Sequence, residues 1–169
     1  MRAAGLREGM RVLDVGCGTG GVSLAAARIA GPRGRVVGVD MNPAVLETAR
    51  ANAAAAAMEN VGFEHHVLPD VELAEPVDAL VGRLILMHLA DPVAVVKALT
   101  RSVRPGGLVM FQEINVSRAR AIPDVPLVTT CRERICAARR EAGSDPDMGE
   151  QLARVLRSAG PARPVRGVA

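Results

Sequence analysis

Residues 12–21 read VLDVGCGTGG, and this stretch decides the fold class. An apolar strand ends in a glycine-rich turn, and residues 22–29, which follow the turn, have the composition of a helix. Glycine has no Cβ and tolerates a positive φ, so a ligand can approach such a turn closely. Amide groups at the N-terminus of the helix also point at any negative group that lies there. The stretch therefore predicts a strand, a ligand-binding turn and a helix.

A second apolar run ends in an acid at the spacing that a nucleoside site requires. Residues 36–39 read VVGV, and Asp40 follows them. An acid about 20 residues beyond the glycine-rich turn can bind both hydroxyls of a ribose. The glycine spacing also fits a dinucleotide site, but Asp14 lies where such sites continue an apolar strand, and an acid there needs a cationic or hydrogen-bond-donating partner. The residues predict a nucleoside-cofactor site and leave an NAD-binding oxidoreductase domain as an alternative.

Strand-like and helix-like segments alternate along the first two thirds of the chain. Apolar runs predict strands at residues 10–15, 35–40, 61–68, 77–86 and 108–114, with helices predicted at 20–30, 43–58 and 92–103. Nearly continuous apolar strands that alternate with helices are typical of a parallel sheet covered on both faces, and right-handed crossovers make it doubly wound. Ligands bind such sheets beyond the carboxyl ends of the strands, where Asp14 and Asp40 lie.

The pattern changes after residue 115. We expect a connector over residues 116–126, a basic helix over 127–142 and a last helix over 149–159. Residues 1–115 are therefore predicted to form the cofactor-binding core, and residues 116–169 a helical extension of the same domain.

Composition limits the function classes. The 169 residues fit one domain, and they include two Phe, no Trp and no Tyr, with a net charge of +3. Proteins that read unpaired bases stack them on aromatic rings, so we expect no nucleic-acid partner. An odd count of three cysteines without metal-ligand spacing is typical of reduced, cytoplasmic proteins. No segment has the length of an apolar membrane span, and we see no signal peptide.

Four stretches in order resemble the class I S-adenosylmethionine-dependent methyltransferases. They are residues 12–20, residues 38–43 (GVDMNP), residues 77–92 and the RPGG of residues 104–107. The resemblance covers residues 11–114 and implies a Rossmann-like α/β sheet of strand order 3-2-1-4-5. Family members usually complete the sheet with a C-terminal antiparallel hairpin, which we expect to be missing or reduced to a stub here. The fifth strand would then be an open edge, through which the chain could form a homodimer.

The resemblance also implies a set of cofactor-binding residues. They are Asp14, Gly16, Cys17, Gly18, Thr19, Gly20, Asp40, Met41, Val67 and Arg83. The glycine-rich turn would close around the methionine part of S-adenosylmethionine, with Asp14 near its ammonium group and Arg83 near its methionyl end. Asp40 would bind the ribose hydroxyls, and Met41 would pack on the adenine. Val67 stands where the family usually has an acid that bonds the adenine amino group.

The predicted reaction is an in-line methyl transfer to a small-molecule acceptor. Such a reaction depends mainly on alignment, and a general base is needed only when the acceptor must lose a proton. His88 is our candidate catalytic base, with Glu113 as a second candidate. The apolar residues on either side of His88 would form either part of the core or a wall for a hydrophobic acceptor. They are Leu84, Ile85, Leu86, Met87 and Leu89. A non-catalytic cofactor-binding relic, or a fragment of a longer methyltransferase, is an alternative.

Overall fold

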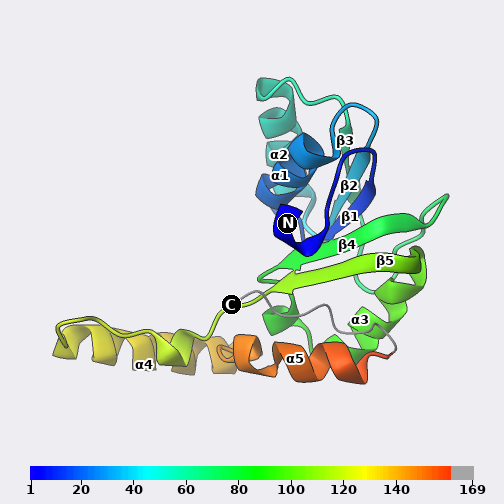
Figure 1. Cartoon of the computed structure of the whole chain (residues 1–169). Coiled ribbons are helices and arrows are strands. Elements are labelled where there is room, and N and C mark those ends of the chain that lie inside the picture. The colour runs from blue at the N-terminus through cyan, green and yellow to red at the C-terminus, as the bar shows by residue number, and fades with distance from the viewer. Residues whose placement is uncertain (161–169) are drawn as a thin grey trace.

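The computed structural model describes residues 1–160 and contains a five-stranded parallel sheet within them (Figure 1). The strands are β1 (Arg11–Val15), β2 (Arg35–Asp40), β3 (Val61–His65), β4 (Val77–Arg83) and β5 (Val103–Gln112). Their order is β3-β2-β1-β4-β5, and every neighbouring pair is parallel. The predicted doubly wound α/β fold and its strand order are confirmed.

Helices cover both faces of the sheet. The helices of the described residues are α1 (Gly21–Ala30), α2 (Pro43–Ala55), α3 (Pro92–Leu99), α4 (Pro126–Glu141) and α5 (Met148–Ser158), and all but α4 pack in the layers around the sheet. Alternate residues of β1 point to opposite faces, as the period of a strand requires. Val12 packs against Ala26 and Ala27 of α1, whereas Leu13 packs in the cluster that includes Leu99 of α3. The sheet is therefore buried between two apolar layers.

Two helices begin as their sequences predict. The side chain of Asn42 accepts a hydrogen bond from the amide of Ala44 at 3.0 Å, and Pro43 occupies the first turn of α2. Asp91 caps α3 in the same way through the amide of Ala94 at 2.9 Å. A side-chain oxygen at this position satisfies an amide that has no partner within the helix.

Several predicted boundaries were wrong. The α2 helix ends at Ala55 rather than residue 58, because Ala57 has a left-handed φ of 51° that turns the chain toward β3. Strand β3 ends at His65, three residues early. The α3 helix ends at Leu99, and a 3-10 turn of residues 100–102 replaces its predicted last turn. The end of a helix therefore depends on the turn that leads to the next strand, and not on helix propensity alone.

The two strands at the other side of the sheet also differ from the prediction. Strand β4 ends at Arg83 rather than residue 86, because Leu84 has a left-handed φ of 57° and residues 86–88 form a 3-10 turn. Strand β5 covers Val103–Gln112 rather than residues 108–114. Residues 104–107 form a bulge within it, since Val77 pairs with Val103 but Ala79 pairs with Leu108.

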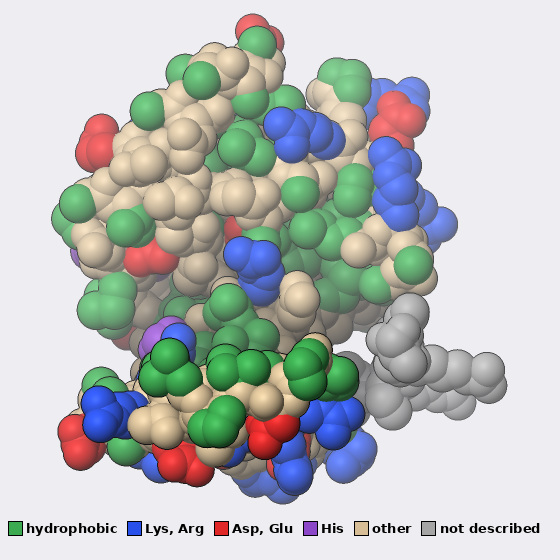
Figure 2. All heavy atoms as spheres, turned by 90° about the vertical axis from the view of Figure 1, so that its left-hand side faces the viewer, with side chains coloured by type: hydrophobic (Ala, Val, Ile, Leu, Met, Phe, Trp, Pro, Cys, Tyr) green, Lys and Arg blue, Asp and Glu red, His purple; other side chains and the backbone are tan. Residues whose placement is uncertain are grey.

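The segment after β5 contains the two predicted helices. Buried Met148 and Val155 of α5 pack in one cluster with Val96 of α3. The α4 helix instead extends away from the sheet (Figure 1). Six of the nine exposed large hydrophobic residues among residues 1–160 lie on it or on residues 114–125 before it (Figure 2). The boundary between core and extension near residue 115 stays a prediction. The predicted stub of a sixth strand falls on residues 161–169, outside the described residues.

Candidate cofactor site

The glycine-rich turn between β1 and α1 has a backbone that other residues would not adopt without strain. Gly16 has a φ of 65°, and a Cβ built there would lie 2.6 Å from Cδ1 of Ile85. Gly18 has a φ of 52°, but nothing lies within 4 Å of the place where its Cβ would be. Packing therefore fixes the inner side of the turn, whereas the backbone at Gly18 is open to an approaching ligand.

Asp40 lies at the carboxyl end of β2 and holds the same turn. Its Oδ2 accepts a hydrogen bond from the amide of Gly18 at 2.9 Å, and its Oδ1 accepts one from the amide of Asn42 at 3.0 Å. Each carboxylate oxygen can accept a second hydrogen bond. The half-buried carboxylate is therefore oriented by two amides and still able to accept bonds from two neighbouring hydroxyls, such as those of a ribose.

Asp14 has the donor partner that the sequence requires, but it is buried. The hydroxyl of Ser23, on α1, donates to its Oδ2 at 2.5 Å, and only 1% of Asp14 is exposed. Burial raises the pKa of Asp14 to about 7, although the Ser23 hydrogen bond and the charge of Arg83 oppose the rise. Asp14 thus ties the end of β1 to α1 beneath the turn, and its contact with a cofactor ammonium group stays a prediction.

The other residues of the turn contribute backbone and packing. Cys17 is buried, and its amide donates to the carbonyl of Val39 at 3.0 Å. Burial raises the pKa of its thiol to about 12, so Cys17 is no nucleophile at neutral pH. Thr19 is exposed, and its carbonyl accepts a hydrogen bond from the Asn52 amide at 3.0 Å. A Cβ on Gly20 would lie 2.8 Å from the ring of Phe63.

Met41 and Val67 are exposed apolar side chains that follow β2 and β3. They are 67% and 53% exposed, respectively. A ring nitrogen of His65 lies 3.0 Å from the carbonyl oxygen of Met41 and links the ends of these two strands. Both side chains suit packing against a flat ring, but Val67 offers no acceptor for an amino group. Their contacts with adenine stay predictions.

Arg83 and His88 lie at the carboxyl end of β4 and just beyond it. Both side chains are exposed. The Arg83 guanidinium is near enough to Asp14 to influence the pKa of that carboxyl. His88 ends the 3-10 turn, and its amide donates to the carbonyl of Ile85 at 3.0 Å. The exposed imidazole is accessible to an acceptor, and its role as a base stays a prediction.

The structure also bears on the expectations for Glu113 and for residues 84–89. Oε1 of Glu113 accepts hydrogen bonds from the amides of Ile85 and Leu86 at 3.0 and 2.8 Å, so this oxygen supports backbone rather than facing an acceptor. Leu86 and Met87 are 1% and 2% exposed and pack against α5. Residues 84–89 were expected to form either part of the core or a wall for an acceptor, and the structure places Leu86 and Met87 in the core.

Several residues that shape the turn have little local signal in the sequence. Ser23, Asn52, Phe63 and Ile85 come from four different segments and meet the turn only in the folded chain. The polar Ser23 within an apolar helix was the one available signal, since a buried hydroxyl needs a partner.

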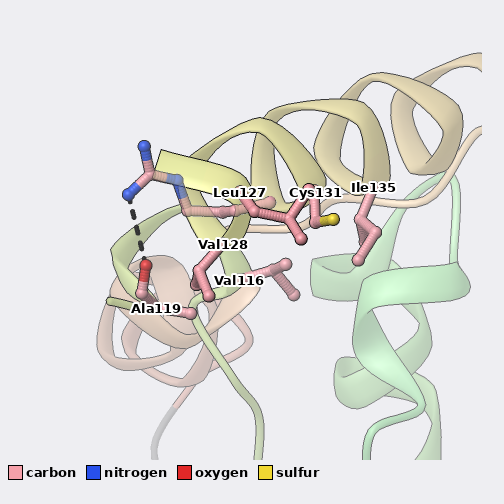
Figure 3. Close-up of a pocket in the computed structure, with 7 residues that line it drawn as sticks. Val116, Ala119, Leu127, Val128, Cys131 and Ile135 are labelled. Atoms are coloured by element: carbon pink, nitrogen blue, oxygen red, sulfur yellow. Dashed lines mark hydrogen bonds between the residues drawn. The ribbon is translucent and has the colours of Figure 1, made fainter. Parts of the chain in front are cut away.

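An apolar groove on α4 is separate from these residues. It has a volume of about 310 Å³ and is lined by Val116, Ala119, Leu127, Val128, Cys131, Arg132 and Ile135 (Figure 3). Arg132 donates to the carbonyl of Ala119 at 3.2 Å. None of the predicted cofactor residues lines the groove. Within residues 1–160, no group of three His, Cys, Asp or Glu side chains is placed to hold a metal ion.

A parallel doubly wound sheet with a glycine-rich turn after β1 and an acid at the end of β2 defines a nucleoside-cofactor protein. A family model described as a methyltransferase domain matches residues 6–160. The chain belongs to this methyltransferase-domain family, and its resemblance to class I S-adenosylmethionine-dependent methyltransferases is confirmed.

Curated relatives carry a more particular description. The chain is 40% identical over 111 residues to a ubiquinone biosynthesis O-methyltransferase of Neisseria meningitidis serogroup A, covering 63% of this chain and 45% of that protein. It is 39% identical over 119 residues to the ubiquinone biosynthesis O-methyltransferase of Acinetobacter baumannii strain AYE, covering 68% and 47%. The chain thus spans about half the length of the curated relatives it matches.

Solved structures agree with the fold. A SAM-dependent methyltransferase from Aquifex aeolicus has a TM-score of 0.58 and 26% identity, covering 62% of this chain and 56% of that one. The [4+2]-cyclase SpnF has a TM-score of 0.68 and 25% identity, covering 92% of this chain and 53% of that one. The helical segment after β5 is therefore included in the similarity to SpnF.

Proposed function

We propose that this chain binds S-adenosylmethionine at the carboxyl ends of β1, β2 and β4 and transfers its methyl group to a small-molecule acceptor. The observation that carries the proposal is the Asp40 carboxylate, which two backbone amides hold beside the open backbone of Gly18. An oriented acid beside a glycine turn is what the ribose of a nucleoside cofactor requires.

The residues around Asp40 fit the other parts of this cofactor. Exposed Met41 can cover the adenine on one side. Exposed Arg83 can pair with the methionyl carboxylate, because a guanidinium donates in a fork that matches a carboxylate. When bound, S-adenosylmethionine supplies a methyl group on a sulfonium with a good leaving group. The protein then has to align the acceptor with that methyl group.

His88 is the proposed base where the acceptor has to lose a proton. Its imidazole is exposed at the end of the turn that follows β4. A neutral imidazole can take a proton near physiological pH, which suits an acceptor hydroxyl or ammonium group. The O-methyltransferase description of the curated relatives supports a hydroxyl acceptor.

Transfer of a labelled methyl group tests the reaction. The chain would be incubated with S-adenosylmethionine carrying a labelled methyl group and a panel of small phenols, amines and carboxylates. Label in an acceptor that depends on Asp40 supports the proposal. Cofactor binding without transfer to any acceptor in the panel would support the non-catalytic alternative.

A second reaction class has one observation in its favour. SpnF, described as a [4+2]-cyclase, covers more of this chain than the Aquifex methyltransferase does. A protein of this fold is therefore described as catalysing a reaction other than methyl transfer. Conversion of a small-molecule substrate without release of S-adenosylhomocysteine would identify such a reaction here.

We also propose a cytoplasmic location and self-association through β5. The cysteines of the described residues are free thiols, as is typical of a reducing compartment; they are Cys17, Cys131 and Cys136. No helix in the part of the chain that the structure describes is long and apolar enough to cross a membrane.

The proposed self-association uses the open edge of the sheet. Among residues 1–160, β5 pairs with β4 alone, which leaves an edge for a second copy. Light scattering after gel filtration would contradict the dimer by giving the mass of one chain.

A further inference from the structure

The turn that follows β4, residues 84–88, is held by the end of β5. Three successive amides donate to it: that of Leu84 to the carbonyl of Gln112 at 2.9 Å, and those of Ile85 and Leu86 to Oε1 of Glu113 at 3.0 and 2.8 Å. Two amides on one carboxylate oxygen make a charge-assisted pair, stronger than bonds between neutral groups. Glu113 is thus the side chain that fixes the start of this turn.

The backbone of the turn needs such support. Leu84 has a φ of 57°, in the left-handed region that leucine rarely adopts. A conformation of this kind persists only where surrounding groups hold it in place. Gln112 accepts a hydrogen bond from the amide of Leu84 itself, and Glu113 accepts those of the next two amides.

The same turn carries two parts of the candidate site. The side chain of Ile85 lies against Gly16, where a Cβ would come within 2.6 Å of it. His88 is the last residue of the turn, and its amide donates to the Ile85 carbonyl. A shift of the turn would therefore move the packing of the glycine-rich turn and the imidazole together.

The far end of the turn is fixed separately. The carbonyl of Met87 accepts a hydrogen bond from the amide of Asp145 at 2.7 Å, and the Met87 side chain is buried against α5. Loss of the Glu113 carboxylate would therefore release Ile85 and Leu86, and with Ile85 the carbonyl to which the His88 amide donates, while the bond at Met87 kept the turn attached to the rest of the fold. This limits the expected effect to the site rather than to the whole fold.

We propose that Glu113 is a positioning residue of the candidate site, whose carboxylate fixes residues 84–88 so that Ile85 supports the glycine-rich turn and His88 faces the acceptor. The proposal rests on the proposed function. Glu113 touches neither cofactor nor acceptor in it, and acts through the backbone of the turn. It replaces the sequence-based hypothesis that Glu113 is a second general base.

Two substitutions at Glu113 distinguish the effect of its negative charge from the effect of its hydrogen-bond acceptor. Glu113→Gln keeps an oxygen that can accept from the two amides, and it replaces Oε2, which is buried without a hydrogen-bond partner among the described residues. Glu113→Ala removes the acceptor altogether. Gln112→Ala is the matched control, because the exposed Gln112 precedes Glu113 and holds Leu84 through its backbone carbonyl, which the substitution keeps.

Two readouts are measured on each variant. The first is S-adenosylhomocysteine affinity by calorimetry. The second is the NMR signal of the His88 ring, which can be assigned because the chain has three histidines. We expect Glu113→Ala to weaken binding about tenfold, since loss of hydrogen bonds to a charged group has effects of this order. We expect Glu113→Gln to weaken it about threefold or less, and Gln112→Ala to leave it unchanged. The His88 signal should shift in Glu113→Ala and return toward its position in Glu113→Gln.

The outcomes distinguish this proposal from the proposed function. Unchanged affinity and an unchanged His88 signal in a folded Glu113→Ala variant would overturn the positioning role. If that variant does not fold, Glu113→Gln decides, and wild-type values for both readouts would overturn the role. If the wild-type chain does not bind S-adenosylhomocysteine, the proposed function fails, but the His88 signal still tests whether Glu113 holds the turn.

Discussion

Replacing Asp40 by asparagine changes one oxygen of the side chain to an amino group and keeps its size. In the structure, Oδ1 and Oδ2 each accept a backbone amide, from Asn42 and Gly18. Whichever position the new NH₂ group takes, it faces a backbone N–H and cannot accept from it. The substitution therefore disturbs the glycine-rich turn and also removes one acceptor for a ribose hydroxyl.

The size of the effect follows from these two losses. A hydrogen bond to a charged group contributes about 1.5–3 kcal/mol, and an amide left without a partner costs about 1–3 kcal/mol. Taken near their lower ends, the two losses amount to about 3 kcal/mol, or roughly a hundredfold in the dissociation constant. We expect Asp40→Asn to weaken S-adenosylhomocysteine binding by about this factor.

Isothermal titration calorimetry measures the change directly. Asp124→Asn is the control, because it makes the same charge change at an exposed position before α4. Thermal unfolding of each variant shows that the domain is folded. An Asp40→Asn variant that is folded and binds within threefold of the wild-type chain would refute the reasoning, since the carboxylate would then contact no ribose.

Three further predictions concern the turn and the core beneath it. Gly16→Ala combines a φ of 65° with a Cβ that would lie 2.6 Å from Ile85, so we expect destabilisation of about 1–3 kcal/mol in denaturant unfolding and loss of cofactor binding; unaltered unfolding would show that the turn is more adaptable than described. The pKa of Asp14 is raised from 3.8 to about 7 by burial. Below pH 4 both folded and unfolded states are protonated, and as the pH rises toward 7 the unfolded chain ionises first, so this group destabilises the fold progressively over that range. Asp14→Asn should therefore gain stability over the wild-type chain between pH 4 and 8, by an amount on the order of a few kcal/mol, and a constant difference across that range would contradict the buried carboxyl. Phe63, 7% exposed and close to Gly20, should cost about 3 kcal/mol of unfolding free energy when replaced by alanine, and a cost below about 1 kcal/mol would mean that its ring is not enclosed.

The sheet could be predicted from the sequence because its signals are local. Each strand is an apolar run, each crossover helix is punctuated by Gly, Pro or a capping residue, and both acids lie at strand ends. The same pattern predicted that Asp40 lies at a strand end beside the glycine-rich turn, and in the structure Asp40 accepts a hydrogen bond from the amide of Gly18 there. These parts depend on periodicity and on the special conformations of glycine and proline.

The remaining parts of the site depend on contacts between distant residues. Leucine and alanine give no local signal for a left-handed φ, yet Leu84 and Ala57 adopt one and end their elements early. The turn that begins at Leu84 is supported by the end of β5, where Glu113 lies 28 residues along the chain from Ile85. The burial of Asp14 against Ser23 likewise depends on how α1 packs on the sheet. Such features emerge only when the tertiary structure is known.

Parallel calorimetric titrations of the wild-type chain with S-adenosylhomocysteine and with NAD test whether the site binds the cofactor of a methyltransferase. Both ligands contain an adenosine ribose. Binding of one without the other therefore distinguishes a methyltransferase site from a dinucleotide site that has the same glycine spacing. We expect one-to-one binding of S-adenosylhomocysteine and no binding of NAD. Binding of NAD alone would contradict it, and so would a folded chain that binds neither ligand.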